Sequence, residues 1–173
     1  MQDKEEPILS IESRLRRLED EAEIRNLIAI HPLFADTGSS RFIRRLWAEN
    51  AVFKRSDGQG TMTLEDMEKT SVGAAHQTAL EGGLAHFCGN PFIRLEGERA
   101  TAISYLQLLT PDPRGELTEV SGHGASRGFF TMKVVANHWS LVRTAQGWRV
   151  EDRIARTLNG DPEARALLES GAD

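Results

Sequence analysis

The sequence has few of the residues that build disulfide-bonded, membrane-spanning or thiolate-metal proteins. Cys88 is the single cysteine in 173 residues, so an intrachain disulfide is excluded and a cysteine-based zinc site is not expected. No apolar run approaches the ~20 residues that cross a bilayer. The polar, acidic start at residues 1–6 does not look like a signal peptide. We therefore expect a protein of the cytoplasm, which is a reducing compartment.

Motifs for metals, nucleotides and nucleic acids are also missing. The five histidines include no HxH or HxxxH spacing that would preorganise two metal ligands. No glycine-rich phosphate loop follows a predicted strand, and no G-x-S-x-G motif is present. The net charge of −5 argues against nonspecific nucleic-acid binding, which requires a basic face. The sequence therefore predicts no metal, no cofactor, and neither a nucleic acid nor a membrane as partner.

What is present predicts one globular domain over residues 1–173, with a core at about 8–158 and a short helix at 161–169. Apolar residues from Ile8 onward recur at three- and four-residue spacing and predict a first helix over 8–36. Pro32 lacks a backbone N–H, so we expect a kink or a break near His31. Further helices are predicted from Ser39 or Ser40 to Trp47, and over 64–80 after a Thr63–Asp66 capping box.

The second half of the chain reads as strands. We expect strands at 51–54, 84–95, 100–109, 129–143 and 148–156, with a turn at 58–60 and a Pro- and Gly-rich loop at 110–125. Pro91 indicates an edge strand or a bulge. Helices followed by antiparallel strands predict an α+β fold, with the helices on one face of a curved sheet. Such a half-barrel encloses a cavity for a small, largely apolar molecule.

Three stretches carry a resemblance to a known family: Arg14 to Asp36, His86 to Pro91, and Asn137 to Arg143 followed by Gly147 to Val150. They resemble the SnoaL-like branch of the nuclear-transport-factor-2-like (cystatin-like) superfamily. The sequence is most similar to the group with scytalone dehydratase, hexachlorocyclohexane dehydrochlorinase and bile-acid dehydratase. The resemblance implies the cone-shaped half-barrel and a cofactor-independent lyase or isomerase. The Asp and His of those lyases match Asp36 and His86.

The resemblance also points to other positions. A polar residue five before that aspartate corresponds to His31, and an arginine of the dehydrochlorinase matches Arg153 loosely. Two departures leave the substrate open. His31-Pro32 interrupts the usual helix, and the hydroxyl residues with which scytalone dehydratase holds a carbonyl have no clear match, since Tyr105 is the only tyrosine.

The chemistry of these residue types fits proton abstraction. An imidazole titrates near neutral pH, so His86 could act as a general base, with Asp36 fixing its tautomer. Both residues could instead have purely structural roles. Asp36 could be a turn residue that bonds its own backbone, and His86 could be a strand histidine satisfied by the backbone.

Four residues are candidates for substrate binding, each with an alternative. His31 is a pocket acid or a helix-break residue, and Asn90 faces the same side as His86 if the strand is ideal. Tyr105 is a catalytic acid or a core aromatic. Arg153 stabilises a leaving anion or forms a surface ion pair. Of the other polar residues, His76 is expected at the surface and His123 in a lid or a flexible linker. Cys88 is expected to be a small, buried side chain that packs in the core.

A second class of function stays open at this point. The same fold serves as a non-catalytic binding or assembly module, such as the small subunit of ring-hydroxylating dioxygenases. We also expect a homo-oligomer, a dimer or a trimer, formed through the exposed face of the sheet. Its candidate contacts are Phe129, Met132, Val134 and Trp139.

Overall fold

The computed structural model describes residues 10–55 and 60–170. The helices are α1 (Ile11–Asp36), the 3₁₀ turn η1 (Ser40–Phe42), α2 (Ile43–Leu46), α3 (Leu64–Val72), α4 (Ala74–Glu81) and α5 (Pro162–Glu169). The strands are β1 (Trp47–Arg55), β2 (Thr61–Thr63), β3 (Ala85–Cys88), β4 (Phe92–Glu96), β5 (Arg99–Pro111), β6 (Thr118–Val120), β7 (Gly124–Ser126), β8 (Phe129–Thr144) and β9 (Gly147–Thr157). The predicted α+β class is confirmed. Ile8 and residues 58 and 59 of the predicted turn lie outside the described residues.

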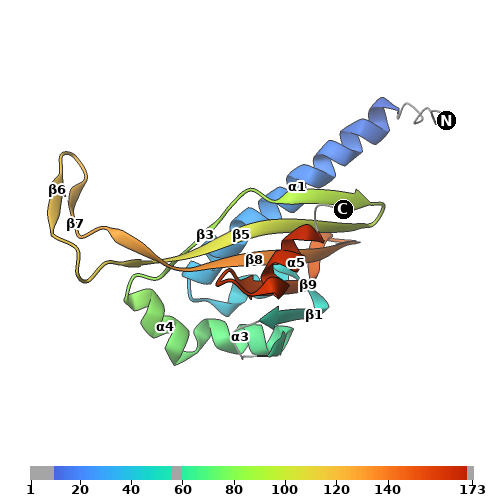
Figure 1. Cartoon of the computed structure of the whole chain (residues 1–173). Helices are drawn as coiled ribbons and strands as arrows, with labels where there is room; N and C mark the ends of the chain where they lie inside the picture. Colours follow the sequence, from blue (N-terminus) through green and yellow to red (C-terminus); the bar gives the residue numbers. More distant parts are fainter. Residues whose placement is uncertain (1–9, 56–59, 171–173) are drawn as a thin grey trace.

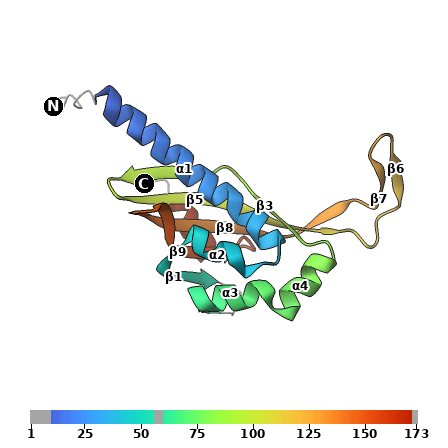
Figure 2. The same cartoon turned by 180° about the vertical axis from the view of Figure 1, so that it is seen from behind.

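One seven-stranded sheet organises the fold, in the order β2-β1-β9-β8-β5-β3, with β4 also paired to β5. The pairs are antiparallel except β1 with β9, which run parallel. Helices α1 to α4 lie on one side of this sheet, and α5 packs on β8 and β9 from the other side (Figures 1 and 2). The site is built in the layer between the sheet and α1 to α4.

Helix α1 continues through the predicted break. Its N-cap is Ser10, whose side chain accepts a hydrogen bond from the backbone N–H of Ser13 at 3.2 Å. Pro32 lies inside the helix and is buried, so a break, one of the two outcomes expected near His31, does not occur. Only the last turn follows this proline, and the missing N–H leaves one helical bond unmade there. The uninterrupted helix carries His31 and Asp36 on one rigid element.

The core is formed by alternating residues of the long strands against α1. Trp139 and Leu141 of β8 and Trp148 of β9 are at most 1% exposed and pack with Ile24 and Ile28 of α1. Full burial of side chains of this size contributes about 1.5–3 kcal/mol each. Trp139, expected on an oligomer surface, is a core residue, because it points to the helix side of the sheet.

Other predicted boundaries are corrected by glycine and proline. Gly73 takes an extended conformation (φ −69°, ψ 146°) and divides the predicted helix at 64–80 into α3 and α4. Pro91 follows a break that divides the predicted strand at 84–95 into β3 and β4. Trp47 opens β1 instead of ending a helix. The predicted loop at 110–125 contains the β6–β7 hairpin, an arm that projects far from the sheet (Figure 1).

Candidate functional site

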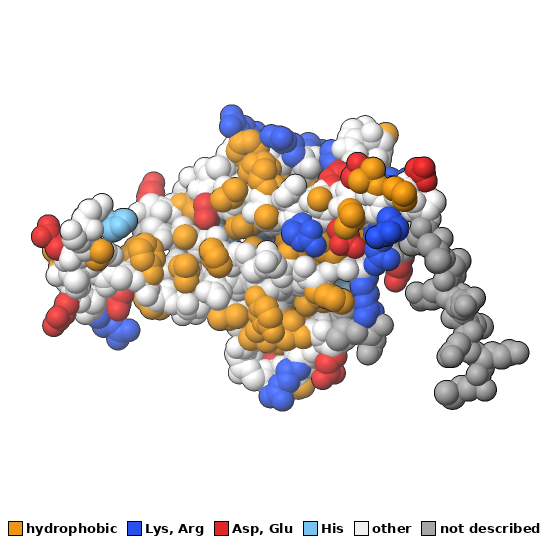
Figure 3. Space-filling view, turned by 90° about the horizontal axis from the view of Figure 1, so that it is seen from above, with side chains coloured by type: hydrophobic (Ala, Val, Ile, Leu, Met, Phe, Trp, Pro, Cys, Tyr) orange, Lys and Arg blue, Asp and Glu red, His pale blue; other side chains and the backbone are white. Residues whose placement is uncertain are grey.

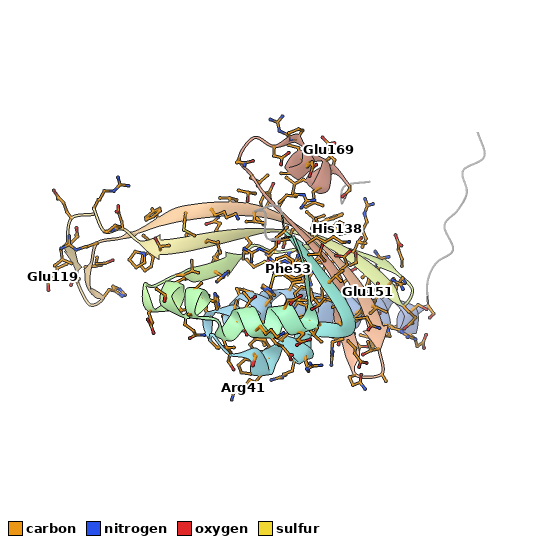
Figure 4. The ribbon with its side chains drawn as sticks, turned by 90° about the horizontal axis from the view of Figure 1, so that it is seen from below. Arg41, Phe53, Glu119, His138, Glu151 and Glu169 are labelled. Atoms are coloured by element: carbon orange, nitrogen blue, oxygen red, sulfur yellow. The ribbon has the colours of Figure 1, made fainter. Side chains whose placement is uncertain are left out.

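A cavity of about 270 Å³ lies between the sheet and the helices. Both the helices and the strands of the sheet contribute to its walls. Most of the lining residues are apolar: Ala35, Ile43, Trp47, Phe53, Met62, Met67, Leu84, Leu106, Leu108, Val135 and Ala155. Figure 4 shows Phe53 on the side of the sheet that faces the helices. A concave, mostly apolar space with a few polar groups is the usual form of a small-molecule site.

Asp36 and His86 meet at the wall of this cavity. Nδ1 of His86 lies 2.6 Å from Oδ1 of Asp36, and the backbone N–H of His86 donates to Oδ2 of Asp36 at 3.0 Å. The side chains are 14% and 30% exposed. Asp36 therefore fixes both the start of β3 and the ring of His86. With Nδ1 bonded to the carboxylate, Nε2 is the ring nitrogen left for a molecule in the cavity.

Arg153 of β9 also lines the cavity and is 2% exposed. Nε and Nη2 donate to Oδ1 of Asn137 at 3.0 and 2.8 Å. The guanidinium lies between the rings of Phe53 and Trp139, with Cζ 4.5 and 4.4 Å from their centroids. These contacts orient the cation by hydrogen bonds and cation–π attraction.

Arg153 makes no ion pair with a carboxylate among the described residues, although it is buried. Burial lowers the pKa of Arg153 to about 9, Cys88 opposes this effect, and Arg55 adds to it. A buried cation without a carboxylate is costly, because water no longer solvates it. Of its five N–H bonds, three are used by Asn137 and His31. The guanidinium can therefore take an anion from the cavity.

His31 accepts the third of these hydrogen bonds. Its Nε2 lies 2.8 Å from Nη1 of Arg153, and since arginine can only donate, Nε2 carries no proton in this contact. Burial lowers the pKa of His31 well below its usual range, and the charge of Arg153 lowers it further. His31 is thus a neutral acceptor that holds Arg153 in place. Its expected role as a pocket acid is not what this geometry favours.

The fold and the sequence match a known protein family. Residues 16–154 match the SnoaL-like domain family. The chain belongs to this family. No curated protein sequence matches the chain. The resemblance to SnoaL-like, nuclear-transport-factor-2-like proteins inferred from the sequence is confirmed.

Solved structures similar to this SnoaL-like chain share its fold over most of their length. An NTF2-like protein with a cystatin-like fold from Novosphingobium aromaticivorans is 31% identical over 95% of this chain and 98% of that chain, with a TM-score of 0.79. Hexachlorocyclohexane dehydrochlorinase LinA-type3 from Novosphingobium barchaimii is 14% identical over 84% and 90%, with a TM-score of 0.57. A function-unknown protein of Mycobacterium tuberculosis is 14% identical over 96% and 93%, with a TM-score of 0.66. The last two show the fold alone.

A second histidine of the SnoaL-like domain lies beside the Asp–His pair, and the sequence did not predict it. His76 of α4 lines the cavity, and its ring centroid is 6.2 Å from that of His86. Its Nε2 lies 3.0 Å from the carbonyl oxygen of Ala35, to which it donates. Helix α4 has no fully buried residue, so its sequence carries no periodic signal for an inward face. The expectation that His76 is a surface residue is corrected.

Asn90 and Tyr105 do not reach the cavity. β3 ends at Cys88 and the break before Pro91 leaves Asn90 exposed, so the ideal-strand register expected for it is lost. Tyr105 is 49% exposed, whereas its neighbours Ser104 and Leu106 are buried. Because side chains alternate along a strand, Tyr105 lies on the opposite face of β5 from the cavity wall. Both residues are therefore set aside as substrate ligands.

Other polar side chains have structural roles or lie away from the cavity. Asn137 of β8 accepts from Arg153 on the helix side of the sheet, and His138 lies on the other face, toward α5 (Figure 4). His123 is exposed in the arm, whose Glu119 lies far from Phe53 in Figure 4, so a lid carrying His123 is not formed. Cys88 packs against the core, 3.5 Å from the hydroxyl of Ser104.

In residues 10–55 and 60–170, no group of three or more His, Cys, Asp and Glu side chains is placed to hold a metal ion. Among the helices of the same ranges, none combines the length and the apolar character of a membrane span.

Proposed function

We propose that this SnoaL-like protein is a cofactor-independent lyase or isomerase that removes a proton from a carbon atom of a small, largely apolar cyclic substrate. The observation that carries the proposal is the 2.6 Å contact between Nδ1 of His86 and Oδ1 of Asp36 at the wall of an apolar cavity. Asp36 would keep the proton of the neutral ring on Nδ1. Nε2 of His86 then has the free electron pair that a general base requires.

The step balances without a cofactor. Nε2 of His86 takes the proton, the electrons of the C–H bond form the new double bond, and the leaving group departs with its electron pair. The imidazolium that forms is stabilised by the carboxylate of Asp36. If the leaving group is a hydroxyl, the imidazolium returns the proton to give water. A base of this kind accelerates proton transfer about 10²- to 10⁴-fold.

Arg153 supports the proposal from another wall of the cavity. Its guanidinium is buried, held in one orientation by Asn137 and His31, and without a carboxylate among the described residues. A preorganised cation in a water-poor site stabilises negative charge as it develops in the transition state. We assign Arg153 to the leaving anion or the enolate oxygen of the substrate.

The cavity limits the substrate by size and polarity. A volume of about 270 Å³ suits a molecule of one ring or two small rings, and the apolar walls favour a body with few polar groups. Chlorinated cyclohexanes form one test class, because a similar fold belongs to a hexachlorocyclohexane dehydrochlorinase. Cyclic β-hydroxy ketones form the second, because a carbonyl acidifies the adjacent C–H bond.

A substrate screen tests the proposal. The protein is incubated with hexachlorocyclohexane and with cyclic β-hydroxy and β-chloro ketones, and loss of HCl or H₂O is followed by mass spectrometry. We expect turnover of at least one compound, lowered at least about 10²-fold in His86→Gln and retained in His123→Ala, since His123 is exposed in the arm. Turnover in His86→Gln within twofold of wild type would refute the mechanism. Tight binding without turnover of any compound would favour the non-catalytic binding module.

A further inference from the structure

A stripe of exposed apolar side chains runs along the N-terminal half of α1. Ile11, Leu15 and Leu18 are 79%, 54% and 64% exposed, and Ala22 is exposed one turn later. Their spacing of four, three and four residues is the a and d pattern of a coiled coil. Figure 3 shows hydrophobic side chains beside charged ones at the end of the molecule where the grey N-terminal trace begins.

The opposite side of the same helix is the one that contacts the body. The carboxylate of Asp20 pairs with Arg143 and accepts a hydrogen bond from Nε1 of Trp148 at 3.3 Å. Glu23 accepts from the backbone N–H of Trp148 at 2.8 Å, and Ile24 is fully buried. The start of α1 extends beyond the sheet (Figures 1 and 2). The apolar stripe therefore faces away from the body, where a second helix can reach it.

We propose that this stripe pairs with the same stripe of a second copy of the chain as a short parallel coiled coil. In such a pair, Leu15 packs against Leu15 of the second copy, and Ile11 and Leu18 do the same. Arg25 occupies the next position of the stripe and ends it, because two arginines would face each other there. All large apolar residues of the stripe are thereby buried against one another.

The charges beside the stripe select the second copy and the parallel direction. With Ile11 at a d position, Arg14 is at g and Glu19 at the following e, and a parallel dimer brings Arg14 of each copy against Glu19 of the other. Neither residue has an ion pair in the part of the chain that the structure describes. An antiparallel pairing of the same segment would place Glu12 against Glu19, which repel, and Arg14 against Glu21, which attract. Glu21 already pairs with Arg17 of its own helix at 3.2 Å, so this attraction does not fully offset the repulsion. Charge complementarity thus favours two parallel copies.

Sedimentation velocity on the full chain tests this interface. We expect a dimer for the wild type and a monomer for Leu15→Gln/Leu18→Gln, whose circular dichroism should be unchanged because both side chains are exposed. Phe92→Ser is the matched control: Phe92 is 57% exposed on the sheet, and this variant should stay dimeric. A monomeric wild type, or a dimer lost in Phe92→Ser and kept in the double variant, would overturn the proposal.

Charge reversal tests the direction of the pairing. Arg14→Glu and Glu19→Arg should each weaken dimerisation about tenfold, since two attractive contacts become repulsive. The double variant Arg14→Glu/Glu19→Arg should restore wild-type affinity. Tighter dimerisation of Glu19→Arg alone would contradict the parallel arrangement, because it would replace the Glu12–Glu19 repulsion of the antiparallel one by attraction.

Discussion

The guanidinium of Arg153 donates from Nη1 to Nε2 of His31 over 2.8 Å. At neutral pH the charged guanidinium can only donate, so His31 must accept and the proton of its neutral imidazole lies on Nδ1. His31 therefore contributes to the proposed mechanism indirectly, by holding the guanidinium of Arg153 in position.

Substitution of His31 should show whether its role is to accept the hydrogen bond from Arg153 or to gain and lose a proton. His31→Gln retains an acceptor oxygen and should keep kcat/KM within about threefold of wild type, whereas His31→Leu should lower it about tenfold, the equivalent of one lost hydrogen bond. The measurement is kcat/KM on the substrate found in the screen. Equal losses in the two variants would show that His31 does more than hold Arg153.

The pH dependence of turnover should report Arg153. Its pKa is lowered to about 9, so the guanidinium is charged at neutral pH and loses its charge as the pH rises through about 9. We expect kcat/KM to fall above that pH, because the stabilisation of the anion disappears. Arg153→Gln should be at least about 10²-fold slower and lack this alkaline fall. A wild-type profile that stays flat well above pH 9 would contradict the assignment.

Stability should fall in mild acid because of His31. Its pKa is lowered in the folded protein, so between the folded and unfolded pKa values the unfolded chain binds more protons. The contribution of His31 to the free energy of unfolding is complete above pH ~6.5. As the pH decreases below this value, the contribution falls by up to about 1.4 kcal/mol per pH unit. Urea unfolding from pH 7.5 to 5 measures this slope. His31→Gln should have a smaller slope, and the same slope in both proteins would argue against a neutral buried His31.

The ion pair between Asp20 and Arg143 should be important for stability. Asp20 is 9% exposed and also accepts from Trp148. Asp20→Ala leaves Nε1 of Trp148 without its acceptor and Arg143 with Glu98 as its remaining partner, and should cost about 1–3 kcal/mol. Glu163→Ala removes the pair of Glu163, 71% exposed, with Arg156 and should change stability by less than about 1 kcal/mol. Equal effects in thermal or urea unfolding would show that burial does not distinguish the two pairs.

The fold could be predicted because its signals are local. Alternation along 100–109, 129–143 and 148–156 reveals the strands but not which of their faces is buried, since Trp139, expected on an oligomer surface, lies in the core. The wrong helix boundaries came from proline and glycine, which a helix can either tolerate or end at. Pro32 is tolerated near the end of α1, and Gly73 ends a helix that periodicity alone would continue.

The site was only partly predictable, because its contacts join distant segments. The family resemblance pointed to Asp36, His86, His31 and Arg153, which all lie at or beside one cavity. The direction of the hydrogen bond between Arg153 and His31 depends on burial and on Asn137, neither of which a pattern reveals. His76 was missed because its helix exposes every face in part. Asn90 was misplaced because the strand ends at Cys88. Tyr105, expected as a catalytic acid or a core aromatic, is half exposed on the other face of β5.

In the proposed mechanism the ring of His86, oriented by Asp36, removes the substrate proton. The most informative measurement is the single-turnover rate of elimination, followed by NMR as the alkene product appears. We predict that His86→Gln lowers the elimination rate about 10²- to 10⁴-fold and that Asp36→Asn lowers it at least about 10²-fold, while His123→Ala matches wild type. A His86→Gln rate within twofold of wild type would contradict the account.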